Sequence, residues 1–544
     1  MRPISRRTAL ASAATLTATG LLASCGGAGG GTDTDEQVEN PDENINAEGM
    51  PIVKEPITLT MMTRRSPNTA EDWNNVASMK LMQEQSNIEI DWGHIPWEQA
   101  SEKRNLALAS GDYPEIIHRT AMNSVDIAKY GEQGTLVRLN DAIDTYMPNL
   151  TAILAENPDF RAGLTFPDGN IYSLPTIYDP EFQSLNMQQK LWIRQDWLDE
   201  VDMDAPETLD EFEACLEAFQ QADPAGGGKT IPFTTGSETL WIDILRSSFG
   251  VGNRGTAAGQ IDADEGGRVR FWPASEQYRE LIAYVSRLYS KKLVQQDVFG
   301  TDSATFNNLG KEGLLGAAAT QAPSAFFTKG VGENYVSLAP MKKTDADEVP
   351  AWTMVGSGLQ SIGQWVVTDK IEHLVESCRW MDYFYGDEGA RLFFMGIEGE
   401  SYEQTGDGEY DFTEKITDNP DGLTVDEALR PYVTYLGGSY PGIVKEAYFK
   451  GTESSAQARK GTEAVAPYKI DEVWPVFTFT AEEAAELSAI TVDLTKLVSE
   501  SRAKFITGEM SVDNDWEKYV SQFQQIGIDR YLEIQQAAYD RFKG

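Results

Sequence analysis

A regular alternation of strands and helices within residues 57–117 is the feature that most constrains the fold. Apolar strands are predicted at 57–62, 88–92 and 113–117, and helices with apolar residues at helical spacing lie between them. Strands joined in this way form a parallel sheet with right-handed crossovers. The loops that follow the strands would then meet at one edge of the sheet, where open α/β sheets bind ligands.

Local signals predict further elements along the chain. Helices are expected after a capping box at Thr208 and Glu211, at 276–290, at 371–385 and over most of the residues from 481 onward. Asp-Gly pairs at 168–169 and 407–408 predict two hairpins.

Composition excludes several classes of function. The 544 residues are 41% hydrophobic, so a large core can form, and the net charge of −40 repels phosphate, so no nucleic-acid partner is expected. Three histidines and three cysteines leave little room for a zinc hydrolase, a His-based catalytic relay or a disulfide framework. Beyond the N-terminus no run of 18 apolar residues occurs, so no transmembrane helix is predicted. Because histidines are so few, no metal or cofactor is predicted either.

The N-terminus has the pattern of an export signal. Arginines precede an uncharged stretch at 9–24, which ends in Leu-Ala-Ser-Cys and resembles a bacterial lipobox. Residues 1–24 are therefore predicted to be a signal peptide and Cys25 to be lipidated, the alternative being an ordinary signal with an incidental cysteine. Arg6-Arg7 also resembles a twin-arginine signal, so the export route stays open.

Residues 25–52 are predicted to be a flexible acidic linker. Glycines follow Cys25, and the residues up to Met50 are rich in Asp, Glu and Asn with few apolar side chains. A lipid, a tether and a globular body together indicate a protein anchored at the extracellular face of the bacterial cell membrane.

Short signatures along the body occur in a characteristic order. They are Ser-Gly-Asp-Tyr-Pro-Glu-Ile-Ile at 110–117, the turn at 130–139, Asp-Gly-Asn-Ile-Tyr-Ser-Leu-Pro at 168–175, the strand-turn-helix at 191–212 and Gly-Ile-Glu-Gly at 396–399. This series resembles the bacterial extracellular solute-binding proteins of family 1, in particular their long lipoprotein-type branch.

The resemblance implies an α/β, two-lobe, periplasmic-binding-protein-like fold of type II. Each lobe would be a mainly parallel sheet flanked by helices, with a helical C-terminal region. The first lobe would comprise residues 53–177 and 350–395, and the second 178–349 and 396–544. The hinge is expected at 175–180 and 340–350, where prolines bracket the crossings.

The resemblance also implies a monomer that captures an oligosaccharide and delivers it to the permease subunits of an ABC importer. Sugars are bound by flat aromatic faces and planar polar groups, and the chain offers 12 Trp and 21 Tyr. Any one tryptophan could equally pack in a core, and adjacent arginines could equally form surface ion pairs. The candidate ligand-binding residues are Arg64, Arg65, Trp97, Asn123, Glu238, Trp241, Phe326, Trp352 and Tyr402.

Three other motifs carry no strong prediction. The Gly-Gly-Gly-Lys-Thr segment at 226–230 lacks the first glycine of a P-loop, and the acidic segment at 262–266 lacks most EF-hand ligands, although an incidental calcium there stays open. Cys215 and Cys378 occupy apolar helix positions and are expected to be buried thiols.

Two alternatives remain beside a non-catalytic receptor. A secreted glycosidase would need two carboxylates, and with 85 acidic residues suitable pairs can arise by chance. A receptor of the same fold could instead bind peptides or metal chelates. The sequence does not identify the sugar, although Arg64 and Arg65 would favour an acidic one if they line the site.

Overall fold

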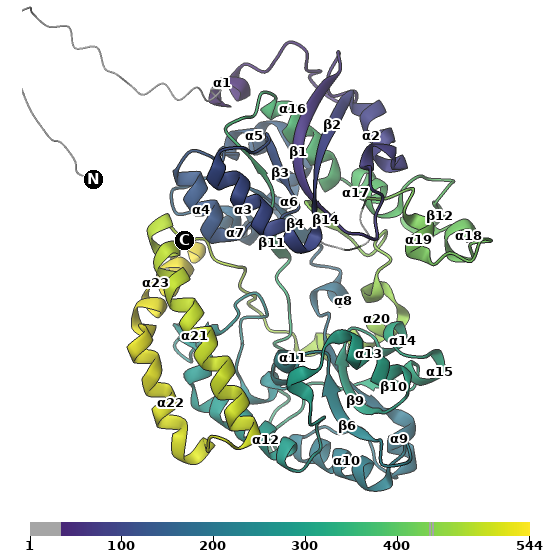
Figure 1. The fold of residues 1–544 in the computed structure, drawn as a ribbon, viewed down its shortest axis with the longest axis vertical. Coiled ribbons are helices and arrows are strands. Elements are labelled where there is room, and N and C mark those ends of the chain that lie inside the picture. The colour runs from purple at the N-terminus through teal and green to yellow at the C-terminus, as the bar shows by residue number, and fades with distance from the viewer. Residues whose placement is uncertain (1–33, 435–436, 438–439) are drawn as a thin grey trace, which may run out of the picture.

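The computed structural model describes residues 34–434, 437 and 440–544. Two lobes stack along the long axis of the molecule, each built around its own β-sheet (Figure 1). The predicted α/β two-lobe fold is thus confirmed. The predicted signal peptide and Cys25 lie outside the described residues.

The first lobe contains a six-stranded sheet. Its order is β14 (Gly442–Val444), β4 (Leu174–Tyr178), β11 (Leu359–Val367), β3 (Ile116–His118), β1 (Ile57–Arg65) and β2 (Ile88–Pro96). β1 pairs in parallel with both β2 and β3, as the strand–helix alternation predicts. The helices of this lobe are α1 (Thr34–Glu39), α2 (Ala77–Ser86), α3 (Ala100–Ser110), α4 (Ser124–Glu132), α5 (Asn140–Tyr146), α6 (Pro148–Glu156), α7 (Pro158–Leu164), α16 (Leu374–Asp382) and α17 (Asp387–Met395).

The second lobe contains a four-stranded sheet. Its order is β10 (Tyr335–Ser337), β5 (Lys190–Arg194), β9 (Leu315–Thr320) and β6 (Ile231–Thr235). Only β6 and β9 pair in parallel, so this sheet is mixed rather than mainly parallel as expected. Its helices are α9 (Gln195–Glu200), α10 (Leu209–Ala222), α11 (Glu238–Asp243), α12 (Glu276–Ser290), α13 (Ser303–Lys311), α14 (Pro323–Phe326) and α15 (Lys329–Gly332), and β7 (Ile261–Ala263) pairs with β8 (Val269–Phe271).

Several local predictions are confirmed and one is wrong. α10 begins with the predicted capping box, and α12 spans the predicted residues. The Asp407-Gly408 hairpin forms between β12 (Tyr402–Gly406) and β13 (Glu409–Phe412). No hairpin forms at Asp168-Gly169, because α7 continues to Leu164 and the turn leads from this helix into β4.

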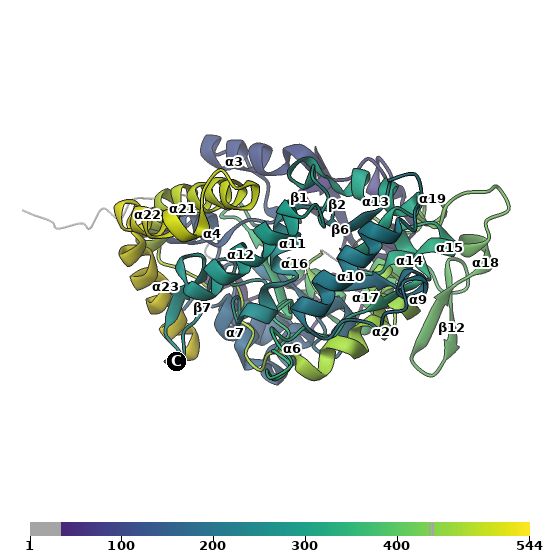
Figure 2. The same cartoon turned by 90° about the horizontal axis from the view of Figure 1, so that it is seen from below.

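The residues after β13 belong to more than one part of the molecule. α18 (Glu414–Thr417) and α19 (Val425–Leu429) form, with the β12–β13 hairpin, a projection on the side opposite the C-terminal helices (Figure 2). β14 then joins the first sheet beside β4. This pairing disagrees with the predicted placement of all of residues 396–544 in the second lobe.

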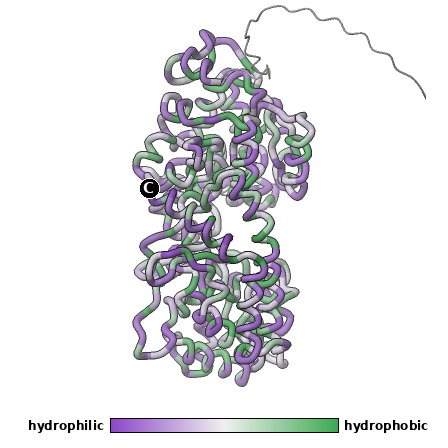
Figure 3. The backbone as a smooth tube through the Cα atoms, turned by 90° about the vertical axis from the view of Figure 1, so that its left-hand side faces the viewer, coloured by the Kyte–Doolittle hydropathy of each residue, from purple (hydrophilic) through white to green (hydrophobic). Residues whose placement is uncertain are grey.

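Three C-terminal helices run along one side of the second lobe and reach the adjoining end of the first lobe (Figure 1). They are α21 (Ala481–Thr507), α22 (Val512–Ile526) and α23 (Ile528–Lys543), so the helical C-terminal region is confirmed. α21 packs against α4 of the first lobe and α12 of the second. No helix of the described part is long and apolar enough to cross a membrane, and hydrophobic and hydrophilic stretches alternate along the chain (Figure 3).

The predicted flexible linker is partly folded. From Thr34 the chain forms α1 and then follows the surface of the first lobe, where Ile52 and Val53 are buried. The sequence prediction is wrong for residues 34–52 because polar side chains in this segment bind backbone groups of the lobe. The Gln37 amide, for example, bonds Ile371 O at 3.3 Å and Leu374 N at 2.8 Å.

Candidate ligand-binding site

The two lobes turn the carboxyl ends of their parallel strands toward each other. α3, which follows β2, lies on the side of the first lobe nearest the second lobe, and α11 and α14, which follow β6 and β9, lie on the opposing side (Figure 1). We call these two surfaces the facing ends. Ligands of open α/β sheets bind at the carboxyl ends of the strands, so the facing ends are the candidate site.

An arginine stacked on a tryptophan lies at the facing end of the first lobe. The guanidinium carbon of Arg64 is 3.8 Å from the centroid of the Trp97 ring. Arg64 is the penultimate residue of β1, and Trp97 directly follows β2. The parallel register, which pairs Arg64 with Ile95, brings the two side chains together. Both are partly exposed. The two residues were predicted separately, and the structure joins them into one platform.

Arg65 extends the positive charge at this edge. Its guanidinium contacts the backbone oxygen of Thr69 at 3.5 Å, and it forms no ion pair within the part of the chain that the structure describes. The side chain is partly exposed.

Two histidines lie beneath these arginines in an aromatic cluster. The ring of Trp73 lies 4.9 Å from His94 and 5.0 Å from Trp92, and Trp92 lies 5.8 Å from His118. Thr63 Oγ1 is 2.9 Å from His118 Nδ1. Sequence reasoning missed this cluster, although the alternation of Trp92 and His94 along a strand was a signal for it.

Both histidines are held neutral at neutral pH. Burial, with the charge of Arg65 adding to it, lowers the pKa of His94 to about 4, although Asp72 opposes the shift. Burial also lowers the pKa of His118 well below its usual value, and Arg119 and Arg64 add to the effect. These two histidines therefore add no positive charge to this lobe end at neutral pH.

The loop after β3 is held in a fixed shape by its neighbours. Met122 N donates to Gly363 O of β11 at 2.9 Å, and the buried Arg104 donates to Thr120 O at 2.9 Å. A Cβ added at Gly363 would lie 1.9 Å from Met122 O, so only glycine permits this approach. The loop backbone has positive φ at Arg119 (56°) and Ala121 (50°), conformations that side chains seldom adopt.

Asn123 and Glu238 are at the facing ends but have structural partners. Asn123 caps α4 by accepting from Asp126 N at 2.8 Å, and its amide donates to Asp126 Oδ2 at 3.0 Å. Glu238 opens α11 and pairs with Arg502 of α21 at 2.9 Å. Each residue therefore orders a helix that borders the site.

Trp241 and Trp352 do not present a face to a ligand. Trp241 is 0% exposed, because α11 turns it inward against Tyr289 of α12. Trp352 is 2% exposed and lies between the lobes, where its backbone N donates to Tyr468 O. The stacking role predicted for both tryptophans disagrees with this burial.

Tyr402 and Phe326 lie in different surroundings. Tyr402 begins β12 of the projection and is 5% exposed, with its ring 6.0 Å from Tyr410, so it is away from the facing ends. Phe326 ends α14 at the facing end of the second lobe and is partly exposed. Phe326 therefore keeps a position that a ligand could reach.

The lobes are joined by chain crossings that contact one another. One crossing leads from β4 to β5 through α8 (Gln183–Asn186), and another leads from β10 to β11. Gly356 N of the second crossing donates to Asn186 O of the first at 2.7 Å. A further crossing follows β14 and includes α20 (Ala456–Val465), which packs against β10. The expected hinge at 175–180 overlaps β4, whereas that at 340–350 falls within the second crossing.

The described residues contain no cluster of three or more His, Cys, Asp or Glu suited to a metal ion. Asp262 of the acidic segment is fully buried and pairs with Arg270 at 2.7 Å.

Asp223 holds the glycine-rich loop at 226–230 by accepting a hydrogen bond from Gly228 N at 2.7 Å. Cys215 and Cys378 are free and buried, as predicted.

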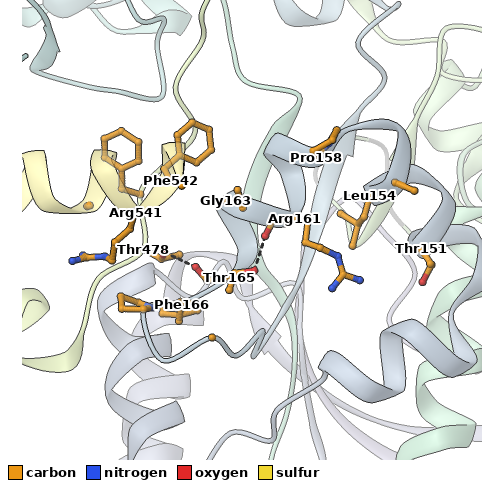
Figure 4. Close-up of a pocket in the computed structure, with 17 residues that line it drawn as sticks. Thr151, Leu154, Pro158, Arg161, Gly163, Thr165, Phe166, Thr478, Arg541 and Phe542 are labelled. Atoms are coloured by element: carbon orange, nitrogen blue, oxygen red, sulfur yellow. Dashed lines mark hydrogen bonds between the residues drawn. The ribbon is translucent and has the colours of Figure 1, made fainter. Parts of the chain in front are cut away.

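A pocket also lies on the flank of the molecule. It has a volume of about 780 Å³ and lies between α6–α7 and the end of α23 (Figure 4). Its two arginines already have acidic partners, since Arg161 pairs with Asp144 and Arg541 with Glu483 at 2.7 Å. The pocket is lined by α6, α7 and α23 rather than by the segments that directly follow β1, β2, β6 and β9, so the ligand is not assigned to it.

The comparison with known families agrees with this arrangement. The model of the bacterial extracellular solute-binding proteins matches residues 66–391, which is more than half of the chain. The chain belongs to this family. As a solute-binding protein it is a non-catalytic component of a transporter, so the expectation of a non-enzyme is confirmed and the glycosidase alternative is set aside.

Individual relatives are distant but similar in length. The fructooligosaccharide ABC transporter substrate-binding protein FusA of Streptococcus pneumoniae is 27% identical over 545 residues, or 98% of each chain. The lipoprotein LipO of Bacillus subtilis is 25% identical over 354 residues, covering 62% of this chain and 66% of LipO. The solved structure of FusA with kestose has a TM-score of 0.72 at 24% identity, covering 90% of this chain and 99% of that one. This solute-binding protein therefore has the fold of a substrate-binding protein of a carbohydrate ABC transporter.

Proposed function

We propose that this solute-binding protein captures an oligosaccharide between its facing ends and delivers it to the permease of an ABC importer. The observation that carries the proposal is the Arg64–Trp97 platform at the carboxyl end of two parallel strands. The flat ring suits the CH face of a sugar, and the planar guanidinium suits paired hydroxyls. The full-length similarity to FusA, which is named for fructooligosaccharides, supports this ligand class.

Capture would proceed by lobe closure. A ligand that contacts both lobes binds the closed form more tightly than the open form and so raises the closed population. The first lobe supplies Arg64, Arg65 and Trp97, and the second supplies Phe326 at the end of α14. The chain crossings would absorb the rotation. The closed monomer would then be the form that docks on the permease.

An acidic oligosaccharide is the second candidate ligand. Arg65 is partly exposed and has no carboxylate partner within the described ranges, and it stands beside Arg64 on an otherwise acidic protein. A sugar carboxylate would gain a charge-assisted hydrogen bond there. A neutral sugar would gain hydroxyl contacts only.

Titration of the mature protein tests these ligands. Calorimetry would compare fructooligosaccharides, uronate-containing oligosaccharides of the same length, and peptides. We expect saturable binding of one oligosaccharide class, a smaller radius of gyration in solution scattering when the ligand is bound, and no products by chromatography. Binding of peptides alone, or binding with no change in the radius of gyration, would contradict the proposal.

We also propose that the protein is anchored at the extracellular face of the cell membrane by a lipid on Cys25. The lipobox-like sequence supports this anchor, and so does the similarity to LipO, a protein named as a lipoprotein. A mass increase of a diacylglyceryl group on a mature N-terminal cysteine would establish the anchor. Recovery of a soluble protein with an unmodified Cys25 would contradict the proposed lipid anchor.

A further inference from the structure

A buried carboxylate lies where the chain crossings meet the second lobe. Glu453 belongs to η7 (Thr452–Ser454), in the crossing that leads from β14 to α20, and its side chain is buried. Its backbone oxygen accepts a hydrogen bond at 2.8 Å from Ser184 Oγ of α8, which belongs to the crossing from β4 to β5. Two crossings are therefore joined at Glu453, on the side of the molecule where the lobes are connected.

Lys190, the first residue of β5, partly compensates the charge of Glu453. Burial raises the pKa of the Glu453 carboxyl, and the attraction of the fully buried Lys190 opposes this shift. Within the described part of the chain no direct ion pair joins the two side chains, and Lys190 Nζ donates instead to Gln188 O at 3.3 Å. The carboxylate of Glu453 therefore needs another hydrogen-bond donor.

Gln321 supplies that donor. It directly follows β9, and its Nε2 donates to Glu453 Oε1 at 3.0 Å. An ionised carboxylate only accepts hydrogen bonds, so it faces the amide nitrogen of Gln321, and the amide oxygen points away from it. Gln321 is partly exposed, and its Oε1 accepts no hydrogen bond from the residues that the structure describes. This oxygen is therefore an oriented acceptor at the facing end of the second lobe.

The strand orders place Gln321 and the Arg64–Trp97 platform on different sides of the site. β4 and β14, which lead into two of the crossings, lie at one edge of the first sheet, and β1 and β2 lie at the other. In the second sheet β9, which precedes Gln321, pairs with β5, which receives the first crossing. A ligand that reaches both Gln321 and the platform must therefore extend across several strands, as an oligosaccharide does.

We propose that Gln321 is a further ligand-binding residue, which accepts a hydrogen bond from a hydroxyl group of the sugar unit nearest the crossings, and that Glu453 positions it. The inference rests on the proposed function and adds a selectivity to it. A free hydroxyl can donate to the Gln321 oxygen, whereas a deoxygenated carbon or a methyl ether at the same position cannot. An acceptor enclosed without a donor weakens binding, so the sugar unit at this end is selected by its hydroxyl.

Calorimetry with kestose and with trigalacturonate tests the contact. Gln321→Leu is similar in volume but has no acceptor, and we expect it to raise the dissociation constant of the sugar that binds by roughly three- to tenfold. Gln220→Leu is the matched control, because Gln220 is exposed on α10 and its Nε2 also donates, to Lys292 O at 2.9 Å. Its dissociation constant should be unchanged.

The outcomes separate this inference from the proposed function. An unchanged constant for Gln321→Leu, together with weaker binding by Trp97→Ala, would overturn the role of Gln321 and leave the proposed function intact. Binding of neither sugar to the unaltered protein would overturn both. Thermal unfolding checks each variant, and Gln321→Met replaces Gln321→Leu if the latter does not fold.

The positioning role of Glu453 has its own readout. The double variant Lys190→Met with Glu453→Leu removes both buried charges together, which avoids leaving one of them uncompensated. We expect it to weaken binding about as much as Gln321→Leu does, and the triple variant to bind no more weakly than either, because both changes act on one contact. Effects that multiply in the triple variant would overturn the positioning role.

Modified sugars test the selected hydroxyl directly. Singly deoxygenated derivatives of the sugar that binds are titrated against the unaltered protein and against Gln321→Leu. We expect one derivative to bind the unaltered protein several-fold more weakly than the parent sugar does, and to bind Gln321→Leu as well as the parent does. If every derivative is weakened to the same degree in both proteins, Gln321 does not receive a hydroxyl and the proposal is overturned.

Discussion

At the scale of single residues, the platform at the first lobe depends on register. Arg64 and Trp97 are 33 positions apart, and they meet only because β1 and β2 pair in parallel with their ends level. The sequence indicated both residues from their positions after strands. It could not show that one stacks on the other, because stacking depends on which face of the sheet each side chain occupies.

Replacing Trp97 by alanine tests the platform. We expect the dissociation constant for the oligosaccharide to rise by the equivalent of about 1–3 kcal/mol, since an aromatic stacking face is lost. Trp241→Phe is the matched control, because Trp241 is buried and its indole N–H has no hydrogen-bond partner in the structure. Calorimetry should show unchanged affinity for the control and weaker binding for Trp97→Ala; the reverse pattern would move the site to the core of the second lobe.

The neutral histidines make stability depend on pH. The pKa of His94 is about 4 when folded and 6.5 in an ordinary setting, so the unfolded chain binds an extra proton between these values. The contribution of the neutral His94 ring to the free energy of unfolding is therefore fully present above pH 6.5. It is lost as the pH falls toward 4. His94→Gln should reduce this loss by on the order of 1 kcal/mol, a value that allows for partial exposure of the ring. Urea unfolding at a series of pH values measures it, and an unchanged pH profile would contradict the assignment.

At the scale of elements, the loop between β3 and α4 is shaped by contacts that are remote in sequence. The start of α10 and both ends of α12 could be predicted from capping and periodicity, because those signals are local. The approach of Met122 to Gly363 could not be predicted in this way, since the two residues are 241 positions apart. The inward turn of Trp241 was missed for the same reason, as packing against α12 decides it.

Gly363→Ala tests the role of this contact. The added methyl group would overlap the backbone oxygen of Met122, which cannot rotate away as a side chain would. We expect a loss of about 1–3 kcal/mol in the free energy of unfolding and weaker ligand binding, because the loop borders the facing end. Gly330→Ala, at a glycine with open space around it, is the control and should leave both quantities unchanged. Normal stability of Gly363→Ala would show that the loop is not held by β11.

At the scale of the whole molecule, α21 connects the lobes outside the crossings. It packs on α4 near its start and reaches α11 through the ion pair of Arg502 with Glu238. The sequence predicted helices after residue 481 but not that they would bridge both lobes, because helical periodicity does not show which surfaces a helix covers. The carboxylate of Glu238 therefore helps to hold α21 against α11.

Removing this ion pair tests the connection. The double variant Glu238→Gln with Arg502→Met avoids leaving a buried charge alone, which would destabilise the fold by itself. We expect a larger radius of gyration for the ligand-free protein and a dissociation constant raised by roughly threefold, because an unrestrained open form competes with the closed one. Solution scattering and calorimetry measure these changes. An unchanged radius would show that α21 does not restrain the lobes.

The same helices also cover aromatic surface of the second lobe. Phe271 packs against Phe523 of α22 with ring centroids 5.1 Å apart, and Tyr278 packs against Trp516 at 6.2 Å. A chain interrupted by a nonsense codon after residue 480 would uncover these rings at the moment of secretion. Such a product would precipitate or be degraded rather than persist as a weakened receptor, so alleles shortened at this end should behave as complete losses of the gene.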